Sequence, residues 1–177
     1  YNWFAAALFA SDALRILPYN RVLKDTNGHS PEELRARLTD VGSCVADADP
    51  VPRGAGHFAF YLEGQWHSLA IDPSTIDQDD PIRSLDGDLL QTRVLSPIFG
   101  VDNPRTDPRI AFVGGSRGTQ ELEHRVDTGT GSVAFSMHPT EMAQVLAVSD
   151  AGEVMPPKCT WFEPKLRSGL FVHELDR

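Results

Sequence analysis

The last third of the chain alternates between two hydrophobic patterns. Short apolar runs over residues 110–113 and 133–137 predict strands, whereas the apolar spacing over 119–126 and 140–148 predicts helices. A further strand is expected over 169–174. Strands and helices that follow one another in this way predict a layered sheet with helices packed against it.

The first part of the chain adds shorter elements. Apolar runs over 3–9 and 14–23 predict a hairpin whose second strand is interrupted at Pro18, which a sheet tolerates only at an edge or a bulge. Ser30-Pro31-Glu32-Glu33 supplies an N-cap residue, a proline at the first helical position and a glutamate three residues after the cap. This motif predicts a helix over 31–40.

The middle of the chain carries a second hairpin and a helix. Alternation over 58–62 and a return over 66–71 predict the two strands, and the leucines and valine over 84–95 have helical spacing. The acidic stretch 72–80 lacks the glycine and glutamate of a calcium loop and is expected to be a solvated connection. The fold class predicted is α+β, with a mixed, mainly antiparallel sheet in one domain over residues 1–177.

Composition limits the partners. The 177 residues include 25 acidic and 16 basic side chains, and the formal charge of −9 argues against nucleic acid or an anionic membrane surface as a partner. Cys44 and Cys159 are far apart and lack a metal-ligand spacing, so reduced thiols in the cytoplasm are expected. No apolar run approaches the roughly 18 residues that span a bilayer.

The chain opens on Tyr1 rather than Met and continues directly into an apolar run that needs neighbouring strands. We therefore expect upstream sequence, and expect this chain to be the C-terminal part of a longer protein and inactive by itself.

A glycine-rich loop lies between a predicted strand and a predicted helix. Glycines let backbone N–H groups converge there, and a helix N-terminus favours an anion, so a phosphate or carboxylate site is one interpretation. The loop is neither a P-loop nor a dinucleotide fingerprint, and a tight strand-to-helix turn is the alternative. Its candidate ligand-binding residues are Gly114, Gly115, Ser116 and Arg117.

The irregular segment 155–169 gathers cations, hydroxyls and aromatic side chains just before the last predicted strand. Such a segment favours an anionic ligand clamped by the cations, with Trp161 and Phe162 as a packing surface. The alternative is a structural plug whose cations pair with carboxylates such as Glu163. Its candidate ligand-binding residues are Lys158, Thr160, Lys165, Arg167 and Ser168.

Other chemistry has little support in the sequence. Cys159 next to Lys158 is a candidate nucleophile, but without an identified base a packed thiol is the simpler interpretation. The six histidines show no metal-ligand spacing, so no metal site is predicted, and no nucleophile elbow indicates a hydrolase.

Four segments carry a resemblance to a known family. Residues 155–171 resemble the C-terminal signature of the bacterial domain of unknown function (DUF) family 1015, and the similarity extends to residues 17–22, 103–107 and 112–115. Where that signature has serine after its lysine, this chain has Cys159, which leaves a packing role intact but not one that needs a hydroxyl.

The resemblance implies a function. Family members have an additional N-terminal region whose Asp-Gly-His-His-Arg stretch resembles the ParB/sulfiredoxin superfamily, which includes free-serine kinases, and their genes often neighbour serine-biosynthesis genes. This implies phosphoryl transfer to serine, or another role in serine metabolism, with a nucleotide and Mg in the full-length protein and catalytic residues in that region.

For this chain the resemblance implies a surface that binds a small anionic metabolite or nucleotide, with the N-terminal region as its partner. The glycine loop and the basic segment are then expected to adjoin in space. Two alternatives stay open: a structural or dimerisation domain that uses residues 1–9 as a contact surface, and a nucleic-acid-binding regulator of ParB-like ancestry.

Overall fold

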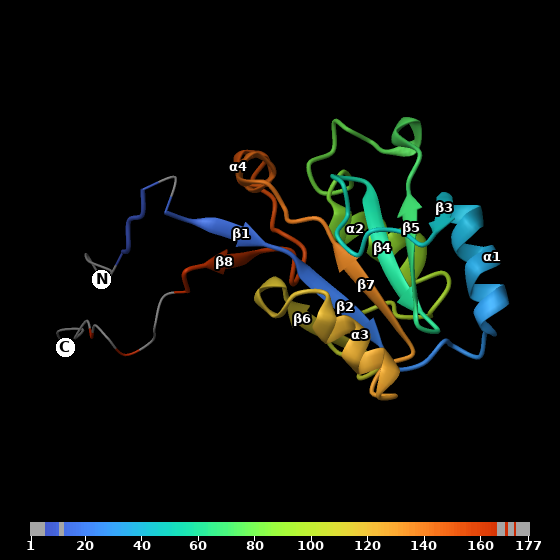
Figure 1. Ribbon diagram of the computed structural model, residues 1–177. Coiled ribbons are helices and arrows are strands. Elements are labelled where there is room, and N and C mark those ends of the chain that lie inside the picture. The colour runs from blue at the N-terminus through green and yellow to red at the C-terminus, as the bar shows by residue number, and fades with distance from the viewer. Residues whose placement is uncertain (1–5, 11–12, 166–168, 170–171, 173–177) are drawn as a thin grey trace.

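The computed structural model describes residues 6–10, 13–165, 169 and 172. Its main feature is a six-stranded sheet in the order β3-β5-β4-β7-β2-β6, in which every described pair is antiparallel (Figure 1). The predicted α+β class with a mainly antiparallel sheet is confirmed. The strands are β2 (Tyr19–Leu23), β3 (Ser43–Ala46), β4 (His57–Leu62), β5 (Gln65–Ala70), β6 (Ile110–Gly114) and β7 (Val133–Met137).

Helices cover both faces of this sheet. Figure 1 shows α3 on one face, while α2 lies behind the sheet on the other. None of the helices in the described ranges has the length and apolar character that a bilayer crossing requires. The helices are α1 (Pro31–Val41), α2 (Asp86–Leu90) with its π-helical continuation η2 (Gln91–Leu95), α3 (Gln120–Asp127) and α4 (Met142–Asp150), together with the short 3₁₀ turns η1 (Pro73–Thr75) and η3 (Gly115–Arg117).

The helix predicted from the Ser-Pro-Glu-Glu motif forms as α1. The Ser30 hydroxyl accepts a hydrogen bond from the Glu33 N–H at 3.2 Å, and the Glu33 carboxylate accepts one from the Ser30 N–H at 2.8 Å. This reciprocal cap satisfies two N–H groups that have no partner within the helix. Leu34 and Leu38, one turn apart, are fully buried against the sheet.

The core lies mainly on the face that α1, α2 and η2 cover. Phe58 and Phe60 of β4 point to this face, because side chains two residues apart in a strand share a side. They pack there against Phe135 of the neighbouring β7. A smaller cluster around Leu122 of α3 covers the opposite face.

A separate two-stranded ribbon corrects the predicted N-terminal hairpin. β1 (Arg15–Leu17) pairs with β8 (Trp161–Glu163), near the other end of the chain, and Figure 1 shows the ribbon extending away from the sheet. Residues 6–10 are exposed and form no strand, and 3–5 lie outside the described residues. Pro18 has no N–H to donate to a ladder, and the chain passes there from the ribbon into the sheet.

Two further differences concern the short elements. β8 forms within the segment that was expected to be irregular, and β3 was not predicted. The strand expected over 169–174 lies almost entirely outside the described residues. Within that range only residues 169 and 172 are described, and neither is in a strand.

Candidate functional site

Arg21 is a charged side chain on the core face of the sheet. It lies in β2 two residues before the buried Leu23, so both side chains point to the same face, and Arg21 is only 4% exposed. Its guanidinium carbon lies 5.5 Å from the ring centre of Phe112 on the neighbouring β6. Burial lowers the pKa of the guanidinium, because the charged form loses its hydration.

Backbone carbonyl groups hold the Arg21 guanidinium. Nη1 donates to the carbonyl of Tyr19, and Nη2 donates to the carbonyl of Lys158 at 3.3 Å. None of the ion pairs among the described residues includes Arg21, and the Asp86 carboxylate attracts it only from beyond ion-pair distance. A guanidinium has five N–H donors, so donors and positive charge remain for a further partner.

A cavity of about 340 Å³ borders this guanidinium. Its volume lies at the lower end of the range for small-molecule sites. Five parts of the chain line it: β2, the α2–η2 helix, the loop before β6, β6 itself and the segment before β8. We call it the Arg21 cavity, and its polar lining consists of Arg21, Asp88, Gln91, Asn103 and Arg105.

Gly87 of α2 permits the close approach of the helix to Arg21. A Cβ at position 87 would overlap with Cys159 Sγ and lie 3.5 Å from Arg21 Nη2. Cys159 is 6% exposed, and burial raises the pKa of its thiol although the Arg21 charge opposes this shift. The thiol is therefore protonated at neutral pH, as expected for a packing group rather than a nucleophile.

Asp86 is the buried carboxylate at the start of this helix. Its Oδ1 accepts a hydrogen bond from the Gly56 N–H at 2.7 Å. Burial raises the pKa of Asp86, whereas that hydrogen bond and the charges of His138, His57 and Arg21 act in the opposite direction. Asp86 thus fixes the loop before β4 to the start of α2.

The loop before β6 presents Arg105 at the rim of the cavity. Asn103 Oδ1 accepts a hydrogen bond from the Arg105 N–H at 3.1 Å, and the Asn103 carbonyl accepts one from Asp107 at 3.0 Å. Asp107 in turn forms an ion pair with Arg109 at 2.7 Å. The loop is therefore fixed, while Arg105 itself is exposed and absent from the ion pairs of the described residues.

The structure brings the predicted glycine loop and basic segment together. A Cβ at Gly114 would overlap with the Trp161 ring, and Gly115 packs against Pro18, whose carbonyl accepts its N–H at 2.8 Å. The Trp161 ring also lies 5.1 Å from the Tyr19 ring, between ring centres. Close packing thus accounts for both glycines, as in the alternative of a tight turn.

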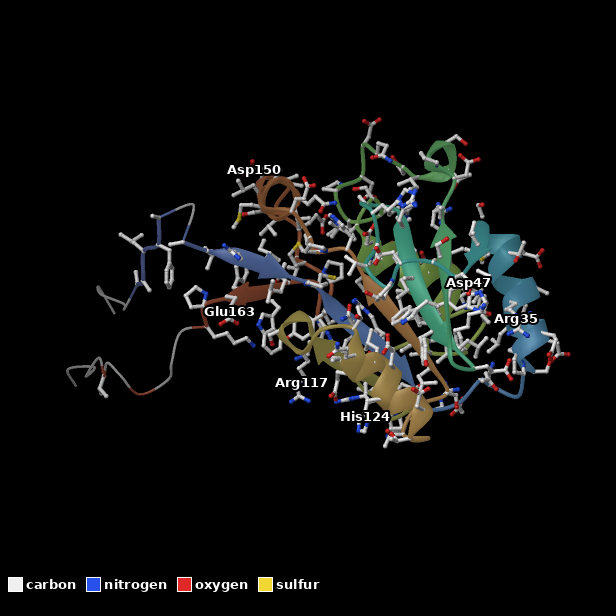
Figure 2. All side chains as sticks on the ribbon, in the orientation of Figure 1. Arg35, Asp47, Arg117, His124, Asp150 and Glu163 are labelled. Atoms are coloured by element: carbon white, nitrogen blue, oxygen red, sulfur yellow. The ribbon has the colours of Figure 1, made fainter. Side chains whose placement is uncertain are left out.

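The cations of these two segments have different surroundings. Arg117 is exposed and forms an ion pair with Glu121 at 3.5 Å, and Figure 2 shows it pointing outward from the sheet. Lys158 lies over the Tyr19 ring at 5.4 Å, and Lys165 lies over the Trp161 ring at 3.5 Å.

The remaining predicted residues do not border the Arg21 cavity. Ser116 is exposed, and Thr160 borders a separate cavity of about 480 Å³ beside the ribbon. Arg167 and Ser168 lie outside the described residues.

Sequence reasoning missed the polar lining of the Arg21 cavity. One signal was available in the sequence. Tyr19 and Leu23, which lie two residues before and after Arg21 and share its face of the strand, are both largely apolar. A charged side chain at a core position of a strand is informative, since charges are rarely buried without a partner. Asp88 and Gln91 carried no comparable signal.

Across the described ranges no three or more His, Cys, Asp or Glu side chains gather in a way that suits a metal ion.

Solved structures with some similarity include a free serine kinase in complex with AMP and a mutant of such a kinase in complex with ADP. The sequence identities are 16% and 17%, with TM-scores of 0.49 and 0.45. In both cases the match covers 86% of this chain and 55% of the other, so the chain spans about half the length of the structures it matches.

No curated protein matches the chain. Residues 1–88 match the model of the family described as "Protein of unknown function (DUF1015)". This range includes β2 and Arg21 and ends at Asp88 in α2, so roughly half of the chain is similar to that family.

Proposed function

We propose that the Arg21 cavity binds the anionic group of a small substrate in a phosphoryl-transfer enzyme of the serine-kinase kind. The observation that carries the proposal is the buried guanidinium, which borders a cavity and has no ion-pair partner among the described residues. Removing a charge from water without a counter-charge is unfavourable. A phosphate or carboxylate in the cavity restores that balance and accepts two hydrogen bonds from one guanidinium.

The position of the cavity supports the same proposal. All four segments that resemble DUF family 1015 meet there, with Arg21 from residues 17–22, Arg105 from 103–107, Phe112 from 112–115 and Pro157 from 155–171. Arg105 adds a second positive charge at the rim. The Lys158 carbonyl fixes the guanidinium, so the basic segment contributes through its backbone.

Within this proposal the described residues bind and orient the substrate. The buried Arg21 holds one anionic group in a fixed direction, because two carbonyl groups fix the guanidinium before the ligand arrives. The nucleotide, the Mg and the residues that transfer the phosphoryl group belong to the rest of the intact protein. Serine is the proposed acceptor, as the family resemblance implies.

Calorimetric titration with inorganic phosphate tests the binding step. We expect Arg21→Met to weaken phosphate binding at least about tenfold, which corresponds to about 1.4 kcal/mol. Arg117→Met is the matched control, because it removes an exposed, ion-paired arginine of the glycine loop, and it is expected to bind phosphate like the wild type.

The reverse result, with binding lost only in Arg117→Met, would place the anion site at the glycine loop. Equal binding by all three proteins would contradict both sites. The reaction itself is tested on the intact protein by an assay for nucleotide-dependent phosphorylation of serine, in which the Arg21→Met variant should raise KM more than it lowers kcat.

A further inference from the structure

One wall of the Arg21 cavity carries hydrogen-bond acceptors. Asp88 and Gln91 both line the cavity and are three residues apart on the continuous α2–η2 helix, which places them on the same side. The arginines come from other parts of the chain, β2 and the loop before β6. The lining is therefore divided between a basic part and an acceptor part.

The side-chain oxygen of Gln91 is a hydrogen-bond acceptor to which no described residue donates. Its Nε2 donates to the Val101 carbonyl at 2.6 Å, and its buried Oε1 has no hydrogen-bond partner among the described residues. Exchanging the two ends of the amide would direct Oε1 at the Val101 carbonyl, so the contact with Val101 fixes the free end as the acceptor. Buried acceptors without a partner are rare in native proteins and call for an explanation.

The helix changes its geometry at Gln91. η2 begins there as a π-helix, and the Ser96 N–H donates to the Gln91 carbonyl five residues earlier at 3.0 Å. Single π-helical turns within α-helices occur frequently at functional sites. At this site the irregular turn coincides with the side chain that has the unused acceptor.

Asp88 adds a carboxylate to the same wall. Burial, followed by the charge of Asp80, raises the pKa of Asp88, while the charge of Arg83 opposes the shift. Asp88 takes part in none of the ion pairs of the described residues. A second anionic group of a ligand is repelled here, whereas an ammonium or hydroxyl group supplies the missing donor.

We infer that the Arg21 cavity accepts a small dipolar metabolite, whose anionic group meets Arg21 and whose ammonium or hydroxyl group donates to Gln91 Oε1 and the Asp88 carboxylate. This inference rests on the proposed function, because it takes Arg21 as the anion site. The phosphate chain of a nucleoside triphosphate carries several negative charges and no donor, so the acceptor wall excludes it from this cavity. The cavity is thus assigned to the acceptor substrate and not to the nucleotide.

Two probes of similar size separate the contribution of the anionic group to binding from that of the ammonium group. Ethyl phosphate carries only the anionic group, whereas phosphoethanolamine carries an ammonium group in addition. We expect phosphoethanolamine to bind the wild type at least about tenfold more tightly in calorimetric titration, and expect this ratio to fall to about one in Gln91→Met and in Asp88→Asn. Gln120→Leu, an exposed glutamine of α3, is the control that keeps the wild-type ratio.

Asp88→Asn keeps the test informative where Gln91→Met fails to fold, since Asp88 makes no side-chain hydrogen bond within the described ranges and Asn has nearly the same shape. Equal affinity of the wild type for both probes, with binding still dependent on Arg21, overturns the dipolar ligand and leaves the anion site. Absence of Arg21-dependent binding for both probes overturns the proposed function as well.

Discussion

Arg21 donates a hydrogen bond from Nη2 to the carbonyl of Lys158 at 3.3 Å, across 137 residues of sequence. Lys158 adopts a positive φ of 57°, a conformation that non-glycine residues rarely take. This contact fixes the segment before β8 to the inner face of the sheet. The site therefore depends on packing between elements far apart in the chain.

Gly87→Ala should destabilise the protein by about 1–3 kcal/mol, because the new Cβ overlaps with Cys159 Sγ. The double variant Gly87→Ala with Cys159→Ala should recover part of this loss, since it removes the overlapping sulfur. Urea unfolding measures both. Gly54→Ala is the control, because a Cβ at Gly54 meets nothing within 4 Å. Equal stability of Gly87→Ala and Gly54→Ala would contradict the packing described for α2.

Gly114→Ala should loosen the contact between the ribbon and the sheet. Its Cβ overlaps with the Trp161 ring, so we expect a loss of about 1–3 kcal/mol in the wild-type background and a much smaller one when Trp161 is replaced by Ala. A double-mutant cycle in urea measures the coupling. Additive effects of the two substitutions would show that Trp161 does not pack on Gly114 in solution.

His67 should make the stability depend on pH. The ring is 5% exposed, stacks on Phe60 at 4.8 Å between ring centres, and its Nε2 has no partner among the described residues. Burial lowers the pKa of His67, and the charge of Arg35 adds to the shift. The unfolded chain therefore binds the proton more readily than the folded protein does.

The contribution of His67 to stability is therefore complete above its unfolded pKa of about 6.5 and falls as the pH drops below that value, until it levels off beneath the folded pKa. Urea unfolding at pH 8 and pH 5 should show this decrease. His67→Phe keeps the stacked ring and should make the stability less dependent on pH. His124→Gln, at an exposed position of α3, should leave the pH dependence unchanged. The same slope in His67→Phe as in the wild type would rule out His67 as the source.

The two thiols should react slowly and at different rates. Burial raises the pKa of both Cys44 and Cys159, but Cys159 is 6% exposed whereas Cys44 is only half-buried. In the Cys44→Ser variant, only the slower thiol of Cys159 remains to react with Ellman's reagent at pH 8. Phosphate bound at Arg21 should slow the reaction of Cys159 further. Fast reaction of Cys159 in the native protein would contradict its packing against Gly87.

Local signals predicted most helices and several strands. The Ser30 capping motif gave the start of α1, and the apolar run over 133–137 gave β7 with the observed bounds. The pairing of β1 with β8 was not predictable, because a ladder between segments near the two ends of the chain has no local signature. The apolar run over 3–9 suggested a nearer partner that does not form over residues 6–9.

The site followed the same division. Local residue chemistry drew attention to both the glycine loop and the basic segment. The expectation that they adjoin agrees with the contact between Gly114 and Trp161. The cavity beside Arg21 depends on five parts of the chain and on the lack of an ion-pair partner for Arg21 among the described residues. Neither can be predicted from local sequence patterns, because both depend on which distant segments meet around the guanidinium.

The ribbon that joins Arg15 to Glu163 has a consequence for how the chain folds. Closing so long a loop costs entropy before its contacts return any stabilisation, so the ladder between β1 and β8 forms late. The segment that supplies Pro157 and the Lys158 carbonyl leads directly into that ladder. Binding competence at Arg21 is therefore acquired only in the last stage of folding.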